Sequence, residues 1–137
     1  MSKTVTTREA AALLRRQDNV LILTHRRPDG DTVGCAAALC LALRQLGKTA
    51  WLLDNPDITA TNGVYVQGLW APENFTPDFV VAVDIAARSL FSPGAEGYGD
   101  RVDLTIDHHP SQEFFAAQTC LEADKAACGE IVYEICR

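Results

Sequence analysis

Acidic and histidine side chains follow three separate hydrophobic runs in this 137-residue sequence. The runs occupy residues 20–24, 79–83 and 102–106, and the side chains that follow them are His25, Asp29, Asp31, Asp84, Asp107, His108 and His109. Carboxylates brought close together repel one another, so some must take up protons unless cations lie between them. Mixed carboxylate and imidazole groups suit manganese, iron, cobalt or zinc better than calcium, and this many groups suits a pair of divalent ions.

Each of these groups has a simpler explanation when it is taken alone. The DGD segment at residues 29–31 is typical of a polar turn. Asp84 could cap a helix, and His108 with His109 could be surface histidines. All three groups are placed directly after hydrophobic runs, and this joint placement favours a metal site over three separate explanations.

The hydrophobic runs predict buried strands, and amphipathic or apolar segments between them predict helices. Strands are expected at residues 20–24, 50–53, 79–83, 102–106 and, as an edge strand, 117–121. Helices are expected at residues 7–16, 33–46 and 128–136. Thr6 and Glu9 have the spacing of a capping box for the first helix, and Asp31 or Thr32 is expected to cap the second.

Two segments have no clear pattern. Residues 54–78 contain several prolines and glycines, and the GVYVQGLW stretch within them fits either a strand or a packed loop. Residues 89–101 predict at best a poor helix. The alternation elsewhere indicates an α/β fold with a mostly parallel sheet, in which the carboxyl ends of the strands lie along one edge. We therefore expect all seven side chains to converge at that edge.

Composition limits the class of protein. The length fits one domain, and the net charge of −6 argues against a large basic surface for nucleic acid. A short anionic substrate remains compatible with this net charge, because bound divalent metals reverse the sign of the local field.

No apolar run reaches the roughly 18 residues of a membrane span, and the first 16 residues do not form a signal peptide, so a cytoplasmic protein is expected. The five cysteines lack a C-x-x-C pair and are expected to be free, mostly buried thiols.

The motifs themselves resemble those of a known family. THRRPDGDTVGC at residues 24–35, the isolated Asp84 and DHHPS at residues 107–111 resemble, in order and spacing, the first three motifs of the DHH phosphoesterases. Within the first motif, the PDGD segment at residues 28–31 resembles that of the oligoribonucleases and 3′-phosphoadenosine-5′-phosphate phosphatases, a branch related to RecJ-type nucleases. It is less similar to the corresponding segment of the manganese inorganic pyrophosphatases. The resemblance implies a Rossmann-like DHH domain with about five strands.

The resemblance also implies a role for each residue. His25 and Asp29 would bind one divalent ion, Asp31 and His108 the other, and Asp84 would bridge them and hold a hydroxide between the two ions. Asp107 would orient a neighbouring histidine, and His109 would face the substrate phosphate as charge stabiliser or proton donor. The ions would be manganese, with magnesium or cobalt as alternatives. Gly30 and Gly34 are expected to let backbone pass close to the metals and to the helix behind them.

One departure from the family concerns the carboxyl-terminal side. Family members have a fourth motif with a further aspartate and a separate basic, glycine-rich substrate domain, and neither is present in residues 1–137. We therefore expect the amino-terminal catalytic portion of a longer enzyme, weakly active or inactive alone, with a short single-stranded oligonucleotide or a 3′-phosphonucleotide as substrate and no membrane partner. The sequence is also compatible with a homodimer of this protein. The alternatives are hydrolysis of a cyclic dinucleotide or a phosphoanhydride, and a metal- or nucleotide-binding module without turnover.

Overall fold

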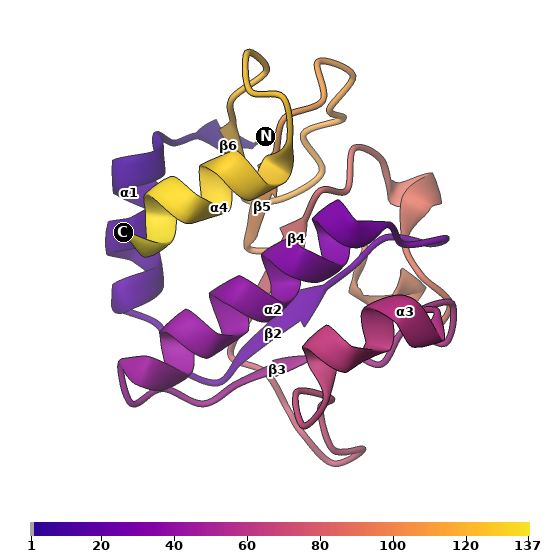
Figure 1. Ribbon diagram of the computed structural model, residues 1–137. Helices are drawn as coiled ribbons and strands as arrows, with labels where there is room; N and C mark the ends of the chain where they lie inside the picture. Colours follow the sequence, from indigo (N-terminus) through magenta and orange to yellow (C-terminus); the bar gives the residue numbers. More distant parts are fainter. Residues whose placement is uncertain (1) are drawn as a thin grey trace.

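Six parallel strands form the sheet of the computed structural model, which describes residues 2–137 (Figure 1). In chain order the strands are β1 (Lys3–Thr4), β2 (Val20–Leu23), β3 (Ala50–Leu52), β4 (Phe79–Val83), β5 (Leu104–Asp107) and β6 (Gln118–Leu121). Their order across the sheet is β1-β6-β5-β4-β2-β3, and every neighbouring pair is parallel. The α/β fold with a parallel sheet is therefore confirmed.

The strands are buried on both faces, as their hydrophobic runs predict. Side chains of one face, such as Ile22, Val81 and Ile106, belong to one core cluster. Side chains that alternate with them, such as Leu21 and Val80, belong to a second core cluster on the opposite face. This continuous burial is typical of a parallel sheet covered on both sides.

The strand predicted at residues 117–121 is present as β6, but its predicted place at the edge of the sheet is wrong. β1 pairs with the outer side of β6, with Lys3 opposite Gln118 and Thr4 opposite Thr119. The backbone N–H of Lys3 donates to the Ala117 carbonyl at 2.9 Å. A strand of two exposed residues has no hydrophobic pattern, and main-chain pairing with β6 places it in the sheet.

The helices are α1 (Thr7–Arg15), α2 (Gly30–Gln45), the short α3 (Ala60–Gly63) and α4 (Cys128–Cys136). The capping box of Thr6 and Glu9 is confirmed at the start of α1. The expected start of α2 is wrong: the helix begins at Gly30, three residues earlier, and its cap is Asp29, whose Oδ1 accepts from the Thr32 N–H at 3.0 Å. No helix within residues 2–137 has the length and apolar character needed to cross a bilayer.

α1, α2 and α4 cover the same face of the sheet (Figure 1). The other face is covered by loops and by two 3₁₀ turns, Arg88–Leu90 and Glu96–Tyr98, where a poor helix is expected. The GVYVQGLW stretch contains a further 3₁₀ turn, Val64–Val66, and Trp70 forms an isolated bridge with Leu52. All five cysteines are free thiols, and all but Cys136 are buried, as expected.

Three neighbouring strands carry the candidate site. β2 lies beside β4, and β4 lies beside β5, so their carboxyl ends are adjacent. The three groups of acidic and histidine residues lie at these ends or directly after them. The topology therefore brings together segments that are about 80 residues apart in sequence.

Candidate metal centre

Asp84 lies at the centre of the candidate site. It directly follows β4, its N–H donates to the Ile106 carbonyl at 2.9 Å, and its side chain is 3% exposed. Its backbone has a φ of 63°, in the left-handed region that aspartate tolerates better than most residues. Within residues 2–137, its Oδ1 is the one buried side-chain polar atom without a hydrogen-bond partner. A strained backbone and an unpaired buried oxygen at one residue are typical of a functional position.

Two histidines approach this carboxylate through the same ring atom. His25 Nε2 lies 3.5 Å from Asp84 Oδ2, and His108 Nε2 lies 3.5 Å from Asp84 Oδ1. Nδ1 of His25 is 2.7 Å from the Arg26 carbonyl, and Nδ1 of His108 is 3.3 Å from the Lys125 carbonyl. A carbonyl only accepts, so each Nδ1 carries a proton, and in the neutral ring each Nε2 has the lone pair that a metal would require.

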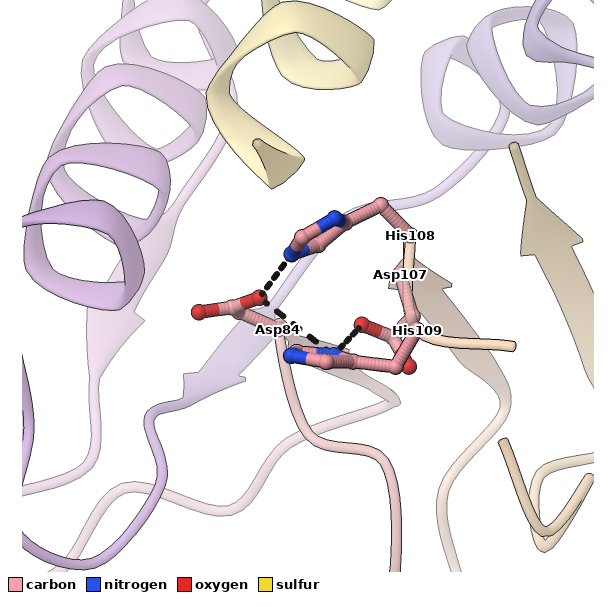
Figure 2. A group of neighbouring side chains, drawn as sticks. All are labelled: Asp84, Asp107, His108 and His109. Atoms are coloured by element: carbon pink, nitrogen blue, oxygen red, sulfur yellow. Dashed lines mark hydrogen bonds and ion pairs between the residues drawn. The ribbon is translucent and has the colours of Figure 1, made fainter. Parts of the chain in front are cut away.

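Two groups of metal-ligating side chains share Asp84. One consists of His25, Asp29 and Asp84; the other consists of Asp84, Asp107, His108 and His109. In each group, ligand atoms lie within 4.8 Å of one another. In the second group (Figure 2), the ring centroids of His108 and His109 lie 4.3 Å apart, and both rings approach Asp84 Oδ1. Two groups with a common carboxylate are the arrangement expected of a bridged pair of ions.

His109 is held by Asp107. His109 Nδ1 lies 2.6 Å from Asp107 Oδ1, while Asp107 is fully buried (Figure 2). The expected orienting role of Asp107 has this contact as its geometric basis. His109 is 40% exposed, more than His25 or His108, so it is the histidine most accessible to a substrate.

Asp31 belongs to neither group. Its Oδ2 accepts from the Cys128 N–H and its Oδ1 from the Gly129 N–H, each at 2.9 Å, at the start of α4. The early start of α2 puts Asp31 in the first helical turn, where it faces α4. A β carbon on Gly129 would lie 3.3 Å from Asp31 Oδ1, so glycine permits this close approach.

The expected crowding around Gly30 and Gly34 is not observed. A β carbon at either position would have no heavy atom within 4 Å. Both glycines lie on α2 and line a groove between α2 and α4 together with Tyr133. Backbone close to the site is instead provided by the turn at Asp84 and by the start of α4.

The surroundings make Asp84 reluctant to ionise. Burial raises its pKa, the nearby Asp31 and Asp29 raise it further, and the contact with His25 only partly opposes them. For His25, burial lowers the pKa, but the contact with Asp84 and the Arg26 carbonyl outweigh burial and raise it. Both shifts favour a bound proton in a site where carboxylates outnumber cations, and a divalent cation would relieve the same conflict.

The donor set fits divalent transition metals. Imidazole nitrogens and carboxylate oxygens suit manganese, cobalt or zinc, and the unpaired Asp84 Oδ1 faces His108 and His109 as an available ligand atom, while Oδ2 faces His25. A hollow of about 300 Å³ opens beside it, lined by His25, Arg26, Arg27, Asp29, Asp84, Leu90 and His109. The site therefore has both the ligands for metal ions and room for a small substrate group.

Sequence reasoning missed three kinds of supporting residue. Buried Asn55 donates from Nδ2 to the His25 carbonyl at 3.0 Å and fixes the loop after β2. Gln112 donates to Asp107 Oδ2 at 2.7 Å. Arg26 and Arg27 line the hollow and form no ion pair within residues 2–137. Gln112 follows His109 by three residues, and the two arginines follow His25 directly. Closeness in sequence to the motifs could therefore have indicated these three residues.

Comparison with known proteins identifies the family. A model described as the DHH family, N-terminal domain, matches residues 19–137. The chain belongs to the DHH family. The bifunctional oligoribonuclease and PAP phosphatase NrnA of Thermus thermophilus is 30% identical to it over 119 residues, which are 85% of this chain and 36% of that relative. The chain thus spans about a third of the length of this DHH relative.

Solved structures share the fold of this DHH chain. An exopolyphosphatase-related protein from Bacteroides fragilis superposes with a TM-score of 0.74 at 19% identity, covering 94% of this chain and 42% of the other. The exonuclease RecJ bound to manganese superposes with a TM-score of 0.56 at 16% identity, covering 96% of this chain and 36% of RecJ. At these identities the likeness establishes the α/β fold alone.

Proposed function

We propose that this chain is a metal-dependent phosphoesterase that hydrolyses short oligonucleotides, 3′-phosphoadenosine-5′-phosphate, or both. The proposal treats residues 1–137 as the amino-terminal catalytic portion of such an enzyme. The observation that carries it is the pair of ligand groups that share Asp84 beside an open hollow. Membership of the DHH family and the oligoribonuclease and phosphatase named for the Thermus relative support the choice of substrate.

Specific residues would hold the ions. His25, Asp29 and Asp84 would bind one divalent ion through their converging atoms. Asp84 and His108 would bind the second, with Asp31 as a further ligand if it leaves the start of α4. Divalent ions bound there would supply Lewis-acid activation of the attacking water and charge neutralisation at the phosphoryl group. Manganese fits this donor set, and magnesium and cobalt are the alternatives.

His109 would act on the substrate itself. Its Nδ1 is committed to Asp107, so its Nε2 is the ring atom left to meet a phosphate oxygen or a leaving oxygen. A protonated Nε2 there would stabilise the growing negative charge or donate a proton to the leaving group. Asp107, as an ionised partner, stabilises the protonated imidazole.

The two arginines would bind a further anionic group of the substrate. Their backbones are anchored, since the Arg26 N–H donates to the Leu90 carbonyl at 2.7 Å and the Arg27 N–H donates to Asp57 Oδ2 at 3.3 Å. Their exposed side chains border the same hollow as His109. In a chain of net charge −6, these positive groups beside the ligands favour a phosphate-bearing substrate.

The proposed activity is tested with the chain itself. Because this portion alone is expected to be weakly active, we expect slow Mn²⁺-dependent release of mononucleotide from a short RNA, or of phosphate from 3′-phosphoadenosine-5′-phosphate, and complete loss of the activity in EDTA. His109→Ala should lower the rate by about 10²- to 10⁴-fold, the usual contribution of a general acid or base. Thermal stabilisation by Mn²⁺ should persist in this variant. Binding of nucleotide without release of either product would contradict the proposal and favour a binding module.

A further inference from the structure

The side-chain amide of Gln112 has one allowed orientation. Its Nε2 donates to the Ile85 carbonyl at 3.0 Å and to Asp107 Oδ2 at 2.7 Å, and its Oε1 accepts from the Phe114 N–H at 2.9 Å. A carbonyl cannot donate and a backbone N–H cannot accept, so exchanging the amide oxygen and nitrogen would break these bonds. Gln112 is buried and therefore presents a fixed donor to Asp107.

Asp107 connects Gln112 to His109 through its two carboxylate oxygens. One carboxylate oxygen, Oδ2, accepts from Gln112, and the other, Oδ1, lies 2.6 Å from His109 Nδ1. Asp107 is fully buried, so no water competes for these oxygens at its surface. An ionised carboxylate only accepts, which places the His109 proton on Nδ1 and leaves Nε2 toward the hollow.

The same amide also connects to the turn at Asp84. Ile85, whose carbonyl accepts from Gln112, directly follows Asp84. Beside it, the Glu113 N–H donates to the Ala86 carbonyl at 2.9 Å. Phe114, which donates to Gln112, has a left-handed φ of 58°. Gln112 thus joins the segment after β4 to the segment after β5, the two segments that supply Asp84 and His109.

From these contacts we propose that Gln112 is a positioning residue of the reaction. It fixes Asp107, and through Asp107 it fixes the tautomer and direction of the His109 ring. The expected effect of Gln112 on the reaction rate rests on the proposed function. Its expected effect on the tautomer of His109 does not depend on any substrate. Gln112 itself does not line the hollow and touches no reacting group.

The tautomer is measured by long-range ¹H–¹⁵N NMR of the histidine rings in EDTA at alkaline pH, where imidazoles are neutral. In the unmodified chain we expect His109 to carry its proton on Nδ1. In Gln112→Met, which has similar size and no amide, the His109 signals should shift toward a mixture of both tautomers. Gln67→Met, a substitution at an exposed glutamine, is the matched control and should leave them unchanged.

A proton on Nε2 of His109 in the unmodified chain would overturn the proposal, even if Gln112→Met does not fold. Unchanged His109 signals in a folded Gln112→Met variant would overturn it as well. Both results are independent of turnover. A purely structural role of Gln112 would lower the melting temperature without changing the tautomer.

The effect on rate is measured in Mn²⁺ with a short RNA substrate. We expect Gln112→Met to lower kcat by about 10- to 100-fold, as removal of an orienting partner commonly does, with KM unchanged. In the His109→Ala background the same substitution should cause no further loss, because its effect passes through His109. Equal losses in both backgrounds would overturn the proposal. Absence of turnover in the unmodified chain would overturn the proposed function alone.

Discussion

At the scale of the residue, Asp84 combines three features that each disfavour a stable fold. Its carboxylate is buried, its backbone is left-handed, and one of its oxygens has no partner. Such features persist where the surrounding structure enforces them, and they gather at functional sites. The sequence places Asp84 after a strand, but it does not reveal the backbone strain or the unpaired oxygen.

Replacing Asp84 by asparagine should stabilise the metal-free chain. Asparagine tolerates a left-handed backbone and removes the buried charge. Because the folded-state pKa of Asp84 is raised, the folded chain binds more protons than the unfolded chain, and its stability falls as pH rises through the unfolded and then the folded pKa. The advantage of Asp84→Asn should therefore grow with pH across that window, as measured by urea unfolding in EDTA.

Asp124→Asn is the control for this comparison, because Asp124 is exposed and lies outside both ligand groups. It should leave the pH dependence of stability unchanged. Calorimetry should also find that Asp84→Asn no longer binds Mn²⁺. An Asp84→Asn variant that is less stable than the unmodified chain at every pH would contradict the stated cost of the buried charge. A variant that binds Mn²⁺ normally would contradict the proposed bridging role of Asp84.

At the scale of the element, the sequence predicts what depends on local hydrophobic pattern. Five strands, the capping box of α1 and the helix of residues 128–136 follow from runs and spacing that lie within one segment. The sheet order then places the motifs at one edge, as the rule for parallel sheets requires. Six of the seven predicted site residues belong to the two groups around Asp84 for this reason.

Features that depend on a partner distant in the sequence could not be predicted. β1 exists because β6 offers unpaired backbone groups, and its own two residues carry no pattern. The direction of Asp31 depends on α4, nearly 100 residues later, whose first N–H groups have no cap of their own from Ala127. Asp31 therefore acts as a capping group supplied by another helix.

This interhelical cap should be measurable. In EDTA, Asp31→Ala should destabilise the fold by about 1–2 kcal/mol, the usual cost of losing an N-cap, because two N–H groups at the start of α4 lose their acceptor. The amides of Cys128 and Gly129 should also exchange faster with solvent. Urea unfolding and hydrogen exchange would check these two effects.

Asp124→Ala serves as the comparison for the cap, since it removes a carboxylate near the same helix end that accepts no hydrogen bond from α4. Its cost should be much smaller. If both substitutions destabilised the chain equally, the general charge at the helix end would explain the effect, and the specific bonds of Asp31 would not.

At the scale of the whole molecule, one site depends on three strands and two helices. The residues around Asp84 come from the ends of β2, β4 and β5, while Asp31 links the first turn of α2 to the first turn of α4. An ion at this edge of the sheet would hold together segments that separate on unfolding. Metal binding and folding should therefore be coupled through the entire chain.

Mn²⁺ should consequently raise the stability of the chain, and it should do so in two unequal steps. An ion that binds only the folded state adds about 2.7 kcal/mol at a hundredfold excess over its dissociation constant. The group of His25, Asp29 and Asp84 is already assembled, whereas the second position lacks Asp31 as long as α4 retains that carboxylate. Calorimetric titration should thus resolve a tighter and a weaker Mn²⁺ site, and the melting temperature should be higher in Mn²⁺ than in EDTA.

Ca²⁺ should stabilise the chain less than Mn²⁺ does, because imidazole is a poor ligand for Ca²⁺. Identical melting in Mn²⁺ and EDTA would exclude the two-metal assignment, and two equal sites would show that α4 releases Asp31 without cost.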